Sequence, residues 1–137
     1  MEGDYDINTD RSLLDVDFVH TYLSQESYWA RGRTKELVEK SIAHSLCFGL
    51  YKGERQIGFG RVVTDFVVFA WLMDLFVDPH FRGKGLGTML VQSIVDHLDL
   101  QQVNGIGLRT EDAHELYRKF GFEKIPKAET WLFRKKK

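Results

Sequence analysis

The sequence predicts a single α+β domain over residues 1–137, with a mixed, mostly antiparallel central sheet of six to seven strands flanked by about four helices. Two observations lead to this prediction. Apolar residues recur every three or four positions in two stretches of the N-terminal third, which is typical of amphipathic helices. From residue 46 onward the pattern changes to short apolar runs bounded by turn residues, which is typical of strands.

The N-terminal third is expected to hold a short strand, residues 5–8, followed by two helices. Asp15 is placed to cap the first helix, which runs through about Ser24, and Thr34 is placed to cap the second. Both side chains can accept hydrogen bonds from the free amides of a first helical turn. The apolar residues at helical spacing are Phe18, Val19, Tyr22 and Leu23 in the first helix, and Leu37, Val38 and Ile42 in the second.

Three strands are predicted in the middle of the chain. Residues 46–51 and 56–63 are apolar runs separated by the turn-like residues 52–55, and a long apolar run covers residues 67–77. Pro79 ends this last strand, because proline cannot donate to a sheet ladder.

A second helix-rich part follows. Leu86, Leu90, Ile94 and Leu98 recur every four residues and predict a helix with one buried stripe. The chain then predicts a strand, a short helix ended by Gly121, and a terminal hairpin, with a basic tail expected to be disordered. These segments are residues 103–110, 111–120, 122–125 with 130–133, and 134–137.

The composition excludes several classes of function. A formal net charge of -1 gives no general case for nucleic acid or an anionic membrane as partner. No apolar run approaches the roughly 18 residues of a membrane span, and the acidic N-terminus has no signal stretch, so a cytoplasmic location is expected. Cys47 is the only cysteine, which excludes an intramolecular disulfide.

The stretch "VDPHFRGKGLGT", residues 77–88, places three glycines, an arginine and a lysine between a predicted strand and a predicted helix. Three phosphate-binding designs use glycine in this way. The Walker loop is excluded because Gly85 follows Lys84, and Asp78 stands in place of its first glycine. The dinucleotide fingerprint is excluded because Thr88 stands in place of its third glycine, and no acidic residue near position 103 could contact a ribose.

The third design is [R/Q]-x-x-G-x-[G/A] between a strand and a helix, and residues 82–87 match it at every position. Here the sequence resembles the GNAT superfamily of acetyl-CoA-dependent N-acetyltransferases. The resemblance implies that backbone N–H groups of the loop and the first helical turn converge on the pyrophosphate of acetyl-CoA, with no metal involved. The residues expected to bind this cosubstrate are Leu75, Phe76, Val77, Arg82, Gly83, Lys84, Gly85, Leu86, Gly87, Thr88 and Asp112.

A second segment, "AHELYRKFGF" at residues 113–122, resembles the later conserved block A-x-x-L-Y-x-x-x-G-F of the same superfamily. The resemblance implies that Tyr117 lies near the cosubstrate sulfur and protonates the departing thiolate. A phenol with an unperturbed pKa of about 10 can donate to a thiolate whose acid form has a pKa of about 8.5. Asp112 stands where many relatives carry an asparagine, so its contact with the cosubstrate stays open.

The resemblance further implies direct attack of an acceptor amine on the thioester, with backbone groups of residues 75–77 stabilising the oxyanion. Asp74 is the candidate general base, because burial in an apolar strand raises the pKa of a carboxyl. The alternative is a structural Asp74 bonded to an arginine or to backbone, with water accepting the proton. Cys47 could carry the acetyl group in a ping-pong scheme, and the alternative is that it is a buried structural cysteine.

The segment "SYWARGR", residues 27–33, falls between the first two predicted helices, where relatives form a wall of the acceptor pocket. Tyr28 and Trp29 would present an aromatic surface, and Arg31 and Arg33 would hold an acidic group of a small primary amine. Alternatively, Trp29 anchors the loop in the core and the arginines are solvated. A protein lysine or N-terminal acetyltransferase, a non-catalytic acyl-CoA sensor, and a homodimer through the terminal hairpin or a strand edge also stay open.

Overall fold

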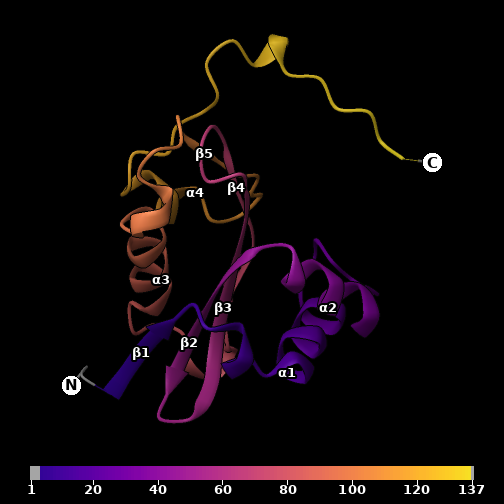
Figure 1. Cartoon of the computed structure of the whole chain (residues 1–137), viewed down its shortest axis with the longest axis vertical. Coiled ribbons are helices and arrows are strands. Elements are labelled where there is room, and N and C mark those ends of the chain that lie inside the picture. The colour runs from indigo at the N-terminus through magenta and orange to yellow at the C-terminus, as the bar shows by residue number, and fades with distance from the viewer. Residues whose placement is uncertain (1–3, 137) are drawn as a thin grey trace.

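The structure is a computed structural model that describes residues 4–136, and its centre is a five-stranded sheet (Figure 1). The strands lie side by side in chain order. The pairings from β1 to β4 are antiparallel, and β4 pairs with β5 in parallel, so the predicted mixed, mostly antiparallel α+β arrangement is confirmed. The strands are β1 (Tyr5–Asn8), β2 (Leu46–Lys52), β3 (Arg55–Thr64), β4 (Ala70–Val77) and β5 (Ile106–Gly107).

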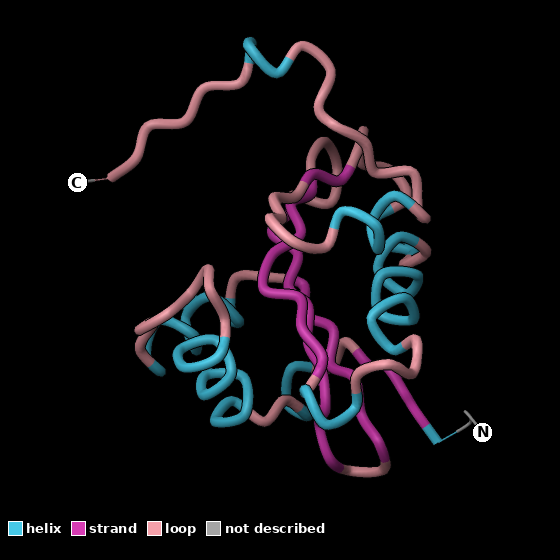
Figure 2. The backbone as a smooth tube through the Cα atoms, turned by 180° about the vertical axis from the view of Figure 1, so that it is seen from behind, coloured by secondary structure: helices cyan, strands magenta, loops and turns pink. Residues whose placement is uncertain are grey.

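Helices cover both faces of this sheet (Figures 1 and 2). On one face lie α1 (Val16–Thr21), which continues into a π-helical turn (Tyr22–Glu26), and α2 (Lys35–Ala43). On the other lie α3 (Leu86–Val95) and α4 (His114–Arg118). The two predicted caps are confirmed: the Asp15 carboxylate accepts from the Phe18 N–H, and the Thr34 hydroxyl accepts from the Leu37 N–H.

The sheet separates two apolar cores. The core beneath α1 and α2 contains Val19, Leu23, Val38, Ile42, Cys47, Phe59 and Phe76. The core beneath α3 contains Phe48, Leu50, Leu72, Leu86, Leu90, Val91 and Ile94, among others. Because the central strands are buried on both faces, they read in the sequence as nearly continuous apolar runs rather than as alternating patterns.

The predicted terminal hairpin over residues 122–125 and 130–133 is wrong. Residues 122–136 contain no strand, so the described chain has five strands rather than six or seven. Since β5 pairs over only two residues, it offers little edge on which further strands could be built. The ring of Phe122 instead packs against that of Tyr117, with the centroids 5.6 Å apart.

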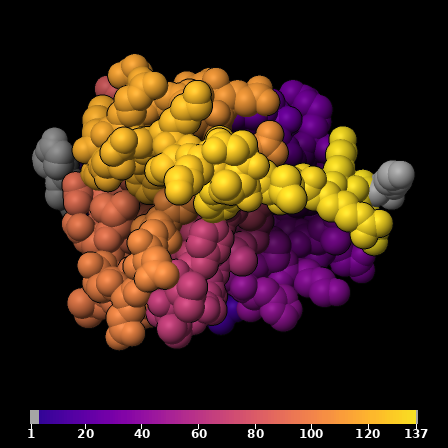
Figure 3. Space-filling model, turned by 90° about the horizontal axis from the view of Figure 1, so that it is seen from above, coloured from indigo at the N-terminus to yellow at the C-terminus, as the bar shows by residue number. Residues whose placement is uncertain are grey.

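The C-terminal segment lies on the outside of the molecule, where Figure 3 shows it in yellow across the face that is turned toward the viewer. After a 3-10 turn (Ala128–Thr130), the side chains of Trp131, Leu132 and Phe133 are exposed. Residues 134–136 of the predicted basic tail are exposed as well, and Lys137 lies outside the described residues. A terminal hairpin is therefore not available in this chain as a dimer surface.

Several element boundaries differ from those predicted. The strand expected from residue 67 begins at Ala70, because the Asp65 carboxylate accepts from the amides of residues 67–69 and closes a turn there. The strand expected over residues 103–110 shortens to β5, and the preceding helix ends at Val95. No helix within residues 4–136 has the length and apolarity needed to cross a membrane.

Candidate active site

A cleft of about 750 Å³ opens where β4 and β5 separate. The two strands pair only at Ala70 with Ile106 and at Trp71 with Gly107. Gly107 is needed for this close approach, since an added Cβ would come within 2.6 Å of the Trp71 ring. Beyond Trp71, this edge of β4 has no paired strand and lines the cleft. Its backbone polar groups are therefore available to a ligand.

One end of the cleft is formed by the glycine loop that joins β4 to α3. Gly83, Gly85 and Gly87 all line it. Gly83 and Gly85 have φ values of 81° and 77°, in the left-handed region that glycine adopts at least cost. A Cβ built at either would meet no atom within 4 Å, so the loop backbone is open to the cleft.

Gly85 is also the N-cap residue of α3, and it has no side chain that could cap the first-turn amides. The first N–H groups of a helix have no intrahelical partner, and the helix dipole places positive potential there. Leu86, Gly87 and Thr88 begin this helix and line the cleft. The arrangement therefore suits an anion, as the sequence pattern implied.

The two basic residues of the loop differ in position. Arg82 lines the cleft, and its guanidinium donates to the Tyr22 hydroxyl at 2.7 Å and to the Val77 carbonyl at 3.3 Å. Lys84 is exposed and does not line the cleft. A further lysine missed in the sequence, Lys119, places its Nζ 3.4 Å from the Thr88 hydroxyl.

β4 contains a bulge along the cleft. Gly58 pairs with Val77 and Arg61 with Met73, so Gly60 faces two residues of β4, Asp74 and Leu75, and the register shifts by one. Asp74 has φ 57°, which is typical of the first position of one class of β-bulge. The bulge reverses the alternation of side chains along the strand.

This reversal places Asp74 on the face covered by α1 and α2. Ala70 and Leu72 belong to the core beneath α3, so simple alternation would direct Asp74 there too. Instead, the Asp74 Oδ1 accepts from the Trp29 indole N–H at 2.8 Å, and its Oδ2 accepts from Arg33 Nη1 and Arg61 Nε at 2.8 and 2.9 Å. The Asp74 side chain has no accessible surface.

Tyr117 lies on α4, on the wall of the cleft opposite β4. Tyr117 is only 8% exposed, and this burial raises the pKa of its phenol to about 12. Tyr28 and Asp112 raise this pKa by smaller amounts. The phenol therefore stays protonated throughout the physiological range. Asp112 also lines the cleft.

The loop between α1 and α2 forms the other end of the cleft, as predicted from the segment at 27–33. Tyr28, Trp29 and Arg33 line the cleft, and the rings of Tyr28 and Trp29 meet edge to face with centroids 5.1 Å apart. Arg31 does not line it, and its guanidinium donates to the Gln25 carbonyl.

Tyr22 and Glu111 also line the cleft and were not identified from the sequence. Arg109 and Glu111 follow β5, at the end of a predicted strand that flanks the cleft, and a charged pair at that place was the available signal.

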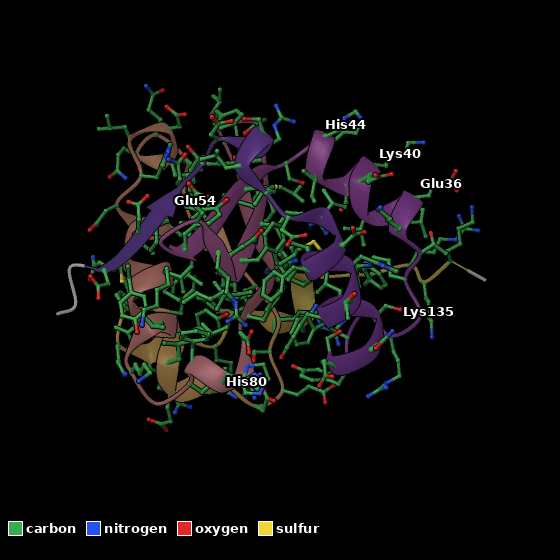
Figure 4. All side chains as sticks on the ribbon, turned by 90° about the horizontal axis from the view of Figure 1, so that it is seen from below. Glu36, Lys40, His44, Glu54, His80 and Lys135 are labelled. Atoms are coloured by element: carbon green, nitrogen blue, oxygen red, sulfur yellow. The ribbon has the colours of Figure 1, made fainter. Side chains whose placement is uncertain are left out.

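His44 ends α2, and Figure 4 shows it at the outer margin of the molecule. Cys47 is buried in the core beneath α1 and α2, away from the cleft lining.

Comparison with known proteins identifies the family. Residues 43–124 match the model of the acetyltransferase (GNAT) domain. A crystal structure from Xanthomonas campestris pv. campestris, described as belonging to the GNAT family, has a TM-score of 0.93 and 40% identity, covering 96% of this chain and 92% of that one. A Gibberella zeae protein named as an acetyltransferase, FG08082, is 28% identical over 137 residues, covering 85% of this chain and 77% of the relative.

A Clostridium acetobutylicum structure with acetyl-CoA has a TM-score of 0.67 at 16% identity, covering 96% of this chain and 94% of that one, and shows a shared fold. The matched family model includes β2 to α4, and so spans both the glycine loop and the helix that carries Tyr117. The resemblance read from these two motifs is thus confirmed. This chain belongs to the GNAT family of acetyltransferases, enzymes that use acetyl-CoA.

Proposed function

We propose that this enzyme transfers the acetyl group of acetyl-CoA to the primary amine of a small molecule that carries an acidic group, by direct attack in a ternary complex. The observation that carries the proposal is a single cleft with an anion-binding glycine loop at one end and an aromatic and arginine wall at the other. Between them lie the free edge of β4 and the Tyr117 phenol.

The residues of the glycine loop fit acetyl-CoA. The open backbone at Gly83 and Gly85 and the uncapped start of α3 would hold the pyrophosphate, with Arg82 beside it. The edge of β4 at residues 75–77 would bind the amide-containing arm. When bound, acetyl-CoA supplies the thioester that makes the acetyl group reactive.

Backbone N–H groups at the β4 bulge are the proposed oxyanion donors. Donors fixed by a sheet need no reorganisation as charge develops on an oxygen, and mutations that remove one such donor commonly cost roughly 10²–10³ in kcat. The bulge at Asp74 and Leu75 turns this part of the strand out of its regular ladder with β3. A bulge of this kind leaves backbone N–H groups unpaired, and here they would lie beside the proposed position of the thioester oxygen.

Tyr117 is proposed as the donor to the departing sulfur. A phenol with a pKa of about 12 is neutral and can donate a hydrogen bond to a developing thiolate. Because the acid form of a thiolate has a pKa of about 8.5, complete proton transfer from such a phenol is unfavourable at equilibrium. We therefore assign Tyr117 a stabilising hydrogen bond during bond breaking, with water delivering the final proton.

The amine must lose a proton, and Asp74 remains a hypothesis for that role. Its carboxylate accepts from one indole and two guanidinium groups. A proton taken up by this carboxylate would weaken these charge-assisted hydrogen bonds. We therefore assign removal of the amine proton to water that enters the open cleft.

The acceptor would lie between Tyr28, Trp29 and Arg33. Arg33 uses Nη1 for Asp74, and its Nη2 is the second donor of the planar fork that suits a carboxylate or phosphate. Arg109 adds a further positive charge to the lining. Together they favour an acceptor that carries an acidic group over a polyamine.

The proposal is tested by measuring thiol release from acetyl-CoA with amines that carry a carboxylate or phosphate, with polyamines and with lysine peptides. We expect the acidic amines to give the highest kcat/KM, and Arg33→Ala to remove this preference while Arg31→Ala leaves it intact. A preference for polyamines or peptides that Arg33→Ala does not change would contradict the proposed acceptor.

A further inference from the structure

Asp74 joins three separate parts of the chain at the acceptor end of the cleft. Trp29 and Arg33 come from the loop between α1 and α2, and Arg61 comes from β3. We infer that Asp74 is a positioning residue that fixes this loop as the acceptor wall and thereby determines acceptor specificity. The inference rests on the proposed acetyl transfer only for the identity of the ligand; the positioning itself is a property of the free protein.

The loop has few other polar links to the body of the molecule. The Ser27 hydroxyl, the Gly32 amide and the Arg31 guanidinium all bond within the loop or to the π-helical turn that precedes it. Among the hydrogen bonds of described residues 27–33 that reach beyond that turn, two end at Asp74 and one joins Tyr28 to Glu111. Asp74 is therefore the link between the acceptor wall and the sheet.

The two guanidinium groups around Asp74 have different environments. Arg61 is 9% accessible at its side chain, and it also donates to the Ser45 hydroxyl. Arg33 is 21% accessible and lines the cleft. One carboxylate balances one of these charges, so the cluster keeps a net positive charge, which it can present to the acceptor only through Arg33.

The geometry argues for positioning rather than proton abstraction. Oδ2 accepts from two guanidinium groups and Oδ1 accepts from the Trp29 indole, so a proton taken from substrate would weaken the hydrogen bonds that hold the wall. The left-handed backbone conformation at Asp74 also favours a positioning role. It fixes the carboxylate toward Trp29 and Arg33, a conformation that Asp or Asn tolerates better than other residues with a Cβ.

Asp74→Asn tests the inference, because asparagine keeps the size and the backbone tolerance of aspartate and removes its charge. In the free protein, we expect amide hydrogen exchange at residues 27–33 to become about tenfold faster or more, as expected for a loop that has lost its main tether. In kinetics, we expect the acceptor KM to rise about tenfold or more while kcat falls less than about threefold. The Kd of acetyl-CoA, measured by calorimetry, should stay within about twofold of wild type.

Asp17→Asn is the matched control, since Asp17 is an exposed aspartate of α1 that pairs with Lys35 outside the cleft. It should leave exchange at residues 27–33 and both kinetic constants unchanged. Trp29→Phe removes one donor to Asp74 and keeps an aromatic ring, so it tests the same link should Asp74→Asn not fold. It should also speed exchange in the loop.

Wild-type exchange at residues 27–33 in Asp74→Asn and Trp29→Phe would overturn the positioning role, whatever the activity. A fall in kcat of about a hundredfold with unchanged acceptor KM and a lost acidic limb of the pH profile would also overturn it, and would make Asp74 the base. Faster exchange in a protein that transfers acetyl to no amine would support the positioning role and contradict only the proposed reaction.

Discussion

The hydroxyl oxygen of Tyr28 accepts a hydrogen bond of 2.9 Å from the backbone N–H of Glu111. This bond joins two segments that line the cleft, since Tyr28 lies between α1 and α2 and Glu111 lies between β5 and α4. It joins the acceptor wall to the segment that precedes the Tyr117 helix. The two walls of the active site are therefore coupled directly and not only through the sheet.

Tyr28→Phe should loosen this coupling. The variant keeps the ring that meets Trp29 edge to face and loses only the acceptor for the Glu111 N–H. We expect a loss of about 0.5–1 kcal/mol in the free energy of unfolding, together with a higher acceptor KM. Denaturant unfolding and steady-state kinetics measure the two effects, with Tyr5→Phe on β1 as a control outside the cleft. Equal effects from both variants would show that the Tyr28 bond has no specific role.

Tyr117→Phe should lower turnover more than it weakens cosubstrate binding. If the phenol donates to the departing sulfur, its loss should reduce kcat by roughly 10²-fold and leave the Kd of acetyl-CoA nearly unchanged. Since the pKa of Tyr117 is about 12, this residue should contribute no limb to the kcat profile in the neutral range. Unchanged turnover at saturating substrates would remove Tyr117 from the mechanism.

Gly85→Ala should weaken acetyl-CoA binding through the backbone. The left-handed φ of 77° at Gly85 would cost an alanine about 1–2 kcal/mol, or would shift the loop. The matched control is Gly105→Ala, since an added Cβ there also meets no atom within 4 Å and its φ lies outside the left-handed range. Calorimetric titration with acetyl-CoA compares them. A weaker affinity in Gly105→Ala as large as that in Gly85→Ala would contradict the role of the loop conformation.

Alkaline pH should destabilise the fold through three buried groups. Burial raises the pKa of the Cys47 thiol from 9.0 to about 11, and it raises the pKa of the Tyr51 and Tyr117 phenols from 10.0 to about 12. The unfolded chain releases these protons first, so the free energy of unfolding should fall as pH rises from about 9 to about 12. Below about pH 9 these groups stay protonated in both states, and the free energy of unfolding should not change with pH because of them. Denaturant unfolding across this range measures the slope.

Cys47→Ala separates the thiol from the phenols in that experiment. The variant should lose part of the slope between about pH 9 and about pH 11 and should keep wild-type acetyl transfer, because Cys47 lies in the core and not in the cleft. Loss of turnover in a folded Cys47→Ala protein would instead support an acetyl-cysteine intermediate.

The glycine loop could be predicted from the sequence because the residues that form the anion site follow one another in the chain. The positive φ at Gly83 and Gly85 and the start of α3 follow from local chemistry, and position counting separated the loop from two other phosphate-binding designs. The caps Asp15 and Thr34 were predictable for the same reason.

For Asp74, the sequence left open a structural bond to an arginine, and the structure confirms this alternative, but the sequence could not identify the partners. The Asp74 side chain direction depends on a register shift between β3 and β4, and its partners lie 45, 41 and 13 residues away in the chain. The terminal hairpin failed for a related reason. The apolar residues 130–133 have strand-like composition, but a strand needs a partner edge, and β5 ends after two residues.

The central claim is that one cleft brings acetyl-CoA and an amine together and moves the acetyl group between them. The most direct test follows a label in the acetyl group of acetyl-CoA during incubation with the enzyme and an amine that carries an acidic group. The account predicts that the label appears on the amine in equal amount to the thiol released, and that Gly85→Ala slows both. Acetyl-CoA that binds but releases thiol at the enzyme-free rate with every amine tested would contradict it.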